Sequence, residues 1–327
     1  MSANTARVSA WVGTTVLLAA LITGAYWWRW TGAATLPTIA FVPQTAGAML
    51  WDVGHFGAKS AAGNLKCHVY WSAPTSETDV NGQIALIDRV GRGNYQGLVL
   101  APNHSLAILA PLRRALDAGL PVVVVSSPLD LPANKKLGYI VNDDEKMGEL
   151  AAAEVARLID GKGSIALMGI ARYAPGVSAR VRAAERYLLS RFPGIRVVSR
   201  QASAFDTTRA EEITIEALDT HPSLNAILSF TAASTRGVYA ALKGRAKLDS
   251  IRVVGCEQDS DLIGYVESGE ISAVLAENTY RMGYEAVNLI AASWTGKPIP
   301  EKSVVAPLLI TRQNLKSTEA SRFLSVP

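Results

Sequence analysis

Short apolar runs alternate with amphipathic stretches from Thr38 almost to the C-terminus, and this alternation most restricts the fold of the chain. The clearest unit is GLVLAPNHSLAILAPLRRALDAGLPVVVVSS, residues 97–127. It predicts, in order, a strand at 97–101, a helix at 105–118 and a strand at 122–125. Ser105 is the expected N-cap of that helix, and Gly119 ends it. Both strands are continuously apolar, which is typical of parallel strands covered by helices on both faces, so the unit is a βαβ crossover.

The same period continues on both sides of this unit. Further strands are predicted at 38–43, 67–71, 138–144, 164–169, 196–199, 225–230, 252–255 and 271–276. The intervening helices are predicted around Trp51 and at 77–90, 145–160, 178–191, 207–219, 234–243, 259–267 and 280–294, before a last apolar run at 304–310. This order predicts two doubly wound parallel α/β lobes. Ligands of such sheets lie beyond the carboxyl ends of the strands, which makes Asn103 and Ser126 candidate contacts.

Composition and motifs exclude several classes of function. The chain has 327 residues, is 49% hydrophobic and carries a formal net charge of +4, with no basic block interleaved with aromatic residues. We therefore expect no nucleic-acid partner. Cys67 and Cys256 form no CxxC, and the four histidines are scattered, so neither a metal site nor a disulfide framework is predicted. Glycine-rich phosphate loops and a GxSxG elbow are missing from the sequence, and we expect no cofactor.

Residues 8–28 are a run of 21 uncharged positions between Arg7 and Arg29. The run is long enough to cross a bilayer, and the tryptophans at its end are typical of a membrane interface. A cleaved secretory signal, with a weak small-residue site at 32–34, is the alternative. No cysteine follows the run, which excludes a lipoprotein. We expect a retained anchor that places the rest of the chain outside the cytoplasm.

Seven stretches, in order, resemble the ribose-binding-like group of type I periplasmic binding proteins, the sugar-binding proteins of ABC transporters. They lie at 79–103, 119–127, 138–152, 178–187, 221–230, 251–258 and 267–278. The resemblance implies two lobes joined by three crossing segments. The implied parts are an anchor or signal with linker at 1–36, a first lobe at 37–141 and 278–306, a second lobe at 142–277 and 307–318, and a tail at 319–327. Regulators of the lactose-repressor type share this core, but the apolar segment stands where their helix-turn-helix would be.

The resemblance also implies a set of ligand-binding residues in the cleft. They are Trp51, Asn103, Ser126, Asp144, Arg180, Phe205, Thr231, Glu257 and Glu277. Trp51 is expected to stack on a sugar ring, and a core position at the start of a helix is the alternative. Arg180 would offer a fork of donors to hydroxyl groups. Three positions depart from the family: Glu257 replaces an Asp, Glu277 a Gln and Thr231 an Asn. Each of the two acids could instead pair with Arg180 or Arg281.

Ser126 and Ser127 also stand where pentose binders carry an Asp-Arg pair. These departures point to a polyol, a modified sugar or a signalling molecule as the ligand. The leading interpretation is a periplasmic substrate-binding protein that captures a small polar ligand for an ABC permease. The alternative is an anchored sensing subunit that signals to a membrane receptor such as a histidine kinase. No nucleophile and base set is recognisable, so we do not expect an enzyme.

Overall fold

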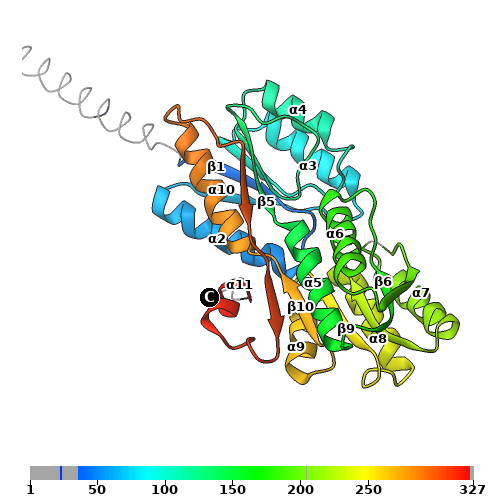
Figure 1. Ribbon diagram of the computed structural model, residues 1–327. Helices are drawn as coiled ribbons and strands as arrows, with labels where there is room; N and C mark the ends of the chain where they lie inside the picture. Colours follow the sequence, from blue (N-terminus) through cyan, green and yellow to red (C-terminus); the bar gives the residue numbers. More distant parts are fainter. Residues whose placement is uncertain (1–22, 24–35, 204, 325–327) are drawn as a thin grey trace, which may run out of the picture. The chain divides into compact units, whose positions relative to one another are not determined.

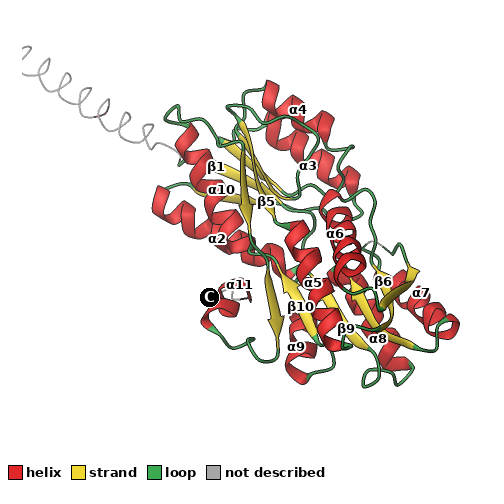
Figure 2. Ribbon diagram, in the orientation of Figure 1, coloured by secondary structure: helices red, strands yellow, loops and turns green. Residues whose placement is uncertain are grey.

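Two six-stranded sheets organise the chain from Pro37 onward (Figure 1 and Figure 2). The computed structural model describes residue 23, residues 36–203 and residues 205–324. The predicted membrane segment at 8–28 lies outside these residues, apart from position 23. Within the described residues, none of the helices is both long and apolar enough to cross a membrane.

The first sheet is parallel throughout, with strand order β11-β5-β4-β3-β1-β2. Its strands are β1 (Thr38–Val42), β2 (His68–Trp71), β3 (Gly97–Leu100), β4 (Val122–Ser126), β5 (Leu137–Asn142) and β11 (Lys302–Val305). One face is covered by α2 (Met49–Leu65) and α10 (Thr279–Ser293), the other by α3 (Val80–Arg92) and α4 (Leu109–Asp117). These elements are called the first lobe below. Burial on both faces explains why its strands are apolar runs.

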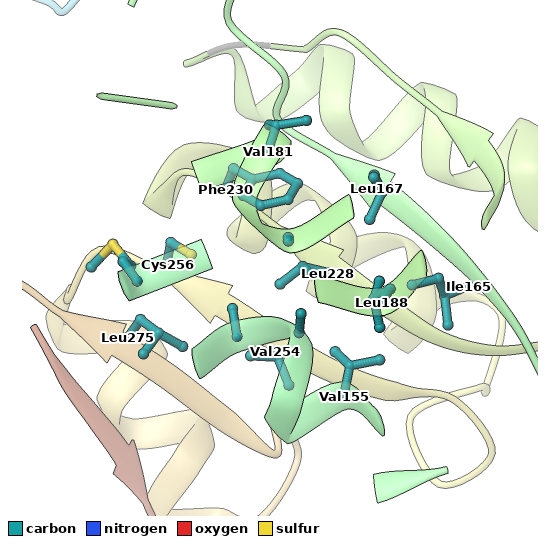
Figure 3. Close-up of a cluster of buried hydrophobic side chains, with 14 of the residues drawn as sticks. Val155, Ile165, Leu167, Val181, Leu188, Leu228, Phe230, Val254, Cys256 and Leu275 are labelled. Atoms are coloured by element: carbon teal, nitrogen blue, oxygen red, sulfur yellow. The ribbon is translucent and has the colours of Figure 1, made fainter. Parts of the chain in front are cut away.

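The second sheet has the order β12-β10-β9-β8-β6-β7. Its strands are β6 (Gly163–Met168), β7 (Ile195–Arg200), β8 (Leu224–Ser229), β9 (Arg252–Cys256), β10 (Ala273–Ala276) and β12 (Leu308–Thr311). One face is covered by α5 (Asp144–Leu158) and α6 (Pro175–Arg191), the other by α7 (Thr207–Thr220), α8 (Ala232–Gly244) and α9 (Ser260–Ser268). Figure 3 shows the core beneath α5 and α6, where Val155 and Leu188 meet Ile165 and Leu228 of the sheet. These elements are the second lobe.

Three details differ from the sequence-based expectation. Helix α4 begins at Leu109 rather than at Ser105, because residues 105–108 form turns. The His104 Nδ1 atom, rather than Ser105, accepts hydrogen bonds from the backbone there, from Leu106 and Ala107 at 3.2 and 3.3 Å.

The other two differences from the sequence-based expectation lie in the C-terminal region. The run at 304–310 is split between β11 and β12, and β12 lies antiparallel to β10, so the second sheet is not wholly parallel. The expected tail contains the helix α11 (Thr318–Leu324), whose Phe323 packs against Ile310.

The chain passes between the two sheets three times. It crosses at Asp143 between β5 and α5, at 277–278 between β10 and α10, and at 306–307 between β11 and β12. After the second crossing, α10 packs against α2 on the first lobe. Both lobes therefore present the carboxyl ends of their parallel strands near the crossings, where a ligand site is expected.

Close contact between α2 and α10 depends on glycine. A methyl group at Gly57 would lie 2.1 Å from the carbonyl oxygen of Tyr280, a backbone atom that cannot move without shifting α10. We expect Gly57→Ala to lower the free energy of unfolding by about 1–3 kcal/mol, as overpacking of a close contact does. Gly63→Ala on the same helix is the matched control, because nothing lies near its added methyl group. It should stabilise the protein by up to about 1 kcal/mol through helix propensity. Urea unfolding of both variants tests this, and a neutral Gly57→Ala would contradict it.

Candidate functional site

A buried cluster of ions is centred on the guanidinium group of Arg180, in the first half of α6. Arg180 Nε donates to Asp144 at 2.6 Å, and Nη1 donates to Glu257 at 2.9 Å. Nη2 donates to Glu277, whose second carboxylate oxygen accepts from the Ser126 hydroxyl at 3.0 Å. We call Arg180, Asp144, Glu257 and Glu277 the Arg180 cluster. Because Ser126 ends β4 of the first lobe, this cluster joins the two lobes directly.

The backbone aims these side chains from the carboxyl ends of strands. Ser126 is the last residue of β4, Glu257 follows β9 and Glu277 follows β10. Ser126 and Glu257 have φ of 67° and 70°, in the left-handed region. That conformation costs a residue with a Cβ roughly 1–2 kcal/mol. Strain of this kind is concentrated at ligand-binding and catalytic sites, where the surroundings hold it in place.

Three acidic side chains surround one guanidinium group, so the acids outnumber the cation in a buried place. Burial alone would lower the pKa of Arg180, but the carboxylates raise it well above its ordinary value. Burial raises the pKa of Glu277 to about 7 despite the attraction of Arg180. Burial likewise raises the pKa of Glu257. Since Arg180 is only 2% exposed, its donors serve these protein groups rather than an open surface.

A cavity of about 400 Å³ lies between the lobes beside Glu257. Its first-lobe wall is formed by the segment from β1 into α2 and by the loop that follows β2. Its second-lobe wall is formed by Phe205, the start of α8 and the segment that joins β9 to α9. Acidic side chains dominate its charged groups: they are Glu77, Glu257, Asp259 and Asp261, against Arg236. The cavity therefore offers many hydrogen-bond acceptors.

Two of the predicted aromatic residues line this cavity from opposite lobes. Trp51, near the start of α2, is 1% exposed and packs within the first-lobe core. Phe205 is half-buried, and its ring centroid lies 6.3 Å from that of Tyr173. Trp51 is therefore a core residue that also lines the cavity, and its stacking on a sugar ring stays a prediction.

Residues 39–298 match the periplasmic binding protein domain, a family match over most of the chain. The chain belongs to this family. Its fold is that of the type I periplasmic binding proteins, as the resemblance in the sequence predicts.

Characterised relatives and solved structures agree with this assignment. The chain is 26% identical to the D-allose-binding periplasmic protein of Escherichia coli K12, covering 86% of this chain and 94% of that protein. It is 25% identical to the ribose import binding protein of Bacillus subtilis, covering 73% of this chain and 75% of that protein. A carbohydrate transporter solute binding protein from Agrobacterium radiobacter, solved with D-arabinose, superposes with a TM-score of 0.83. That structure is 21% identical, and the match covers 90% of this chain and all of that one, which establishes the shared fold.

Two of the predicted site residues have local structural roles in this periplasmic binding protein. The Asn103 side chain donates to the Asp79 carbonyl at 3.2 Å. The Thr231 hydroxyl caps α8 by accepting from the Ser234 N–H at 3.1 Å. Neither is among the described residues that line the cavity. They shape the loops at the ends of β3 and β8.

Sequence reasoning missed several charged residues of the cavity wall. Arg236 lies in the second turn of α8 and pairs with Asp259 at 2.7 Å. Asp259 itself caps α9, accepting from the Asp261 N–H at 3.1 Å. The position of Asp259 just after β9 could have identified it as a site residue, because the carboxyl ends of parallel strands face the ligand. No local pattern marks Arg236 or Glu77, which enter the cavity through the packing of the lobes.

The lobes also touch at the rim, through residues 104–105 and 173. The His104 ring stacks on Tyr173 with centroids 5.6 Å apart and an interplanar angle of 14°. The Ser105 N–H donates to the Tyr173 carbonyl at 3.4 Å. This contact brings the β3–α4 loop of the first lobe against the β6–α6 loop of the second, so the two lobes also touch outside the cavity lining.

Proposed function

We propose that this protein is an extracytoplasmic binding protein that captures a sugar or sugar-like ligand between its lobes for an ABC-type importer. The observation that carries the proposal is the cavity between the lobes, with aromatic and carboxylate groups on its walls. The names of the relatives support it, since they are binding proteins for allose and ribose. Membership of the periplasmic binding protein family supports a periplasmic location.

The walls suit the two kinds of surface that a sugar presents. The C–H face of a sugar ring is apolar and packs on an aromatic ring such as Phe205. Its hydroxyl groups donate to carboxylates such as Glu257, which keeps acceptor capacity beyond its bonds to Arg180 and the Ala232 N–H. Arg180 holds Glu257 in place, and Arg180, Asp144 and Glu277 lie behind it, outside the cavity lining. Trp51 supports the wall from the first-lobe core.

The ligand is expected to drive closure of the lobes. The two lobes would be 37–141 with 278–306, and 142–277 with 307–318, joined by the three crossing segments. A ligand that contacts both walls binds the closed form better than the open one and so shifts the equilibrium towards closure. The rim contact between His104 and Tyr173 would form only in the closed state.

Sugar binding is tested by calorimetry of the purified full-length protein with D-allose, D-ribose, D-arabinose and D-tagatose. We expect at least one of them to bind and Phe205→Ala to weaken that binding about fivefold or more, because a stacked ring contributes roughly 1 kcal/mol beyond its buried area. Leu189→Ala is the control, because this side chain is 82% exposed and lies outside the cavity. Equal affinity in Phe205→Ala and the native protein would remove Phe205 from the site.

We further propose that residues 8–28 stay in the mature protein as a membrane anchor. The 21 uncharged residues and the tryptophans at the end of the run support retention over cleavage. Mass spectrometry of protein purified from membranes should find an N-terminus that precedes this run. A mature N-terminus close to Thr35 would show that the segment is a cleaved signal.

An anchored binding protein also suits a second function, as the sensing subunit of a membrane receptor. Importers work with freely diffusing binding proteins, so retention of the anchor favours sensing. Neighbouring genes separate the two: genes for a permease and an ATPase support import, and a gene for a histidine kinase supports sensing.

A further inference from the structure

The site holds more acidic side chains than the binding of a neutral sugar requires. The cavity and the adjoining Arg180 cluster hold six carboxyl groups and two guanidinium groups among the described residues. The carboxyl groups belong to Glu77, Asp144, Glu257, Asp259, Asp261 and Glu277. Both guanidinium groups are already paired, Arg180 within its cluster and Arg236 with Asp259. Closing the lobes on a neutral ligand would bury Glu257 and Glu77 further with no cation between them, which is costly.

Two of these acids face the cavity from opposite lobes. Glu257 follows β9, and its side chain is 13% exposed. Glu77 lies in the loop that follows β2 and lines the same cavity. Burial, and to a smaller extent the negative charge of Glu77, raise the pKa of Glu257, so the two carboxyl groups lie within each other's field. Their repulsion opposes closure, and a positive charge between them would remove that opposition.

We propose that the cavity selects a sugar or polyol that carries a protonated amine, with Glu257 and Glu77 facing the ammonium group from opposite lobes. This inference rests on the proposed function and specifies its ligand class. An ammonium group supplies three donors and a positive charge together, whereas a hydroxyl group supplies one donor and no charge. The ring of Phe205, on the same wall as Glu257, adds a face on which the ligand can pack. Burial raises the pKa of Glu257 and of Glu277, and a cationic ligand beside Glu257 would favour its ionised form.

Matched ligand pairs test the proposal on the full-length protein. Calorimetry at pH 7.0 compares D-glucosamine with D-glucose, D-galactosamine with D-galactose, D-mannosamine with D-mannose, and 1-amino-1-deoxy-D-glucitol with D-glucitol. We expect at least one amine to bind tenfold or more tightly than its neutral partner. Glu257→Gln and Glu77→Gln should each reduce that preference at least threefold, because each removes one charge and keeps the shape. Glu267→Gln, at an exposed position of α9 outside the cavity, should leave it unchanged.

The possible outcomes separate this inference from the function on which it rests. Binding of neutral sugars with no preference for the amines overturns the ligand class and leaves the binding function intact. A preference for an amine that survives both Glu257→Gln and Glu77→Gln overturns the assigned residues. Failure of every amine and every neutral sugar, including the four sugars named above, overturns both proposals.

Discussion

Replacing Arg180 with glutamine is expected to lower the free energy of unfolding by about 3–5 kcal/mol at pH 8, the usual effect of removing one partner from a buried ion cluster. The substitution leaves Asp144, Glu257 and Glu277 together in a buried space without their cation. Each must then take up a proton or draw water into the protein. Because protonation relieves the repulsion, the loss of stability should be larger at pH 8 than at pH 5. Urea unfolding at both pH values measures it.

Two further variants make this result specific. Arg182 lies on the same helix at an exposed position. Arg182→Gln should therefore change the free energy of unfolding by less than about 0.5 kcal/mol. Adding Glu277→Gln to Arg180→Gln should recover part of the loss, since one of the uncompensated charges is removed. Native stability in Arg180→Gln, or equal losses at pH 5 and pH 8, would mean that the carboxyl groups do not depend on this guanidinium.

The second large effect is a pH dependence that Glu277 imposes on stability. Burial raises its pKa from 4.5 to about 7, so the folded protein keeps this proton where the unfolded chain has lost it. The stability that Glu277 contributes is therefore complete below pH 4.5 and is lost as the pH rises through about 7. Between pH 5 and pH 8 the loss should reach about 1–3 kcal/mol. Glutamine resembles the protonated acid, so Glu277→Gln should lack this loss and be at least as stable as the native protein at pH 8.

The comparison is the difference in unfolding free energy between Glu277→Gln and the native protein, measured at intervals from pH 5 to pH 8. As the pH rises, the variant should become increasingly more stable than the native protein. Glu212→Gln is the control, because this side chain is 60% exposed and its variant should follow the native curve. A difference that stays constant with pH, or that grows in favour of the native protein, would show that Glu277 is ionised throughout.

Local sequence patterns alone predict the order of the elements and the kind of sheet. Residues 122–125 are four consecutive valines, and only a strand buried on both faces accepts such a run, as β4 does. Gly119 has φ of 91° and ends the helical segment as expected, because a residue without a Cβ tolerates that conformation. Both features depend on neighbouring residues in the chain, so the local sequence is enough to predict them. The resemblance to the family implies that Arg180 and the acids Asp144, Glu257 and Glu277 lie in a cleft, but it does not predict how they contact one another.

Tertiary structure decided what those residues do. Ser126 and Glu277 are 151 positions apart and form a hydrogen bond, so no local pattern reveals their contact. Arg180 was expected to offer its donors to a ligand, yet the folded protein surrounds it with carboxylates. Glu77 joins the site only because a loop of the first lobe meets the second lobe. The charge state of each acid depends on its burial and on charges brought from distant parts of the chain, and both arise only when the two lobes pack together.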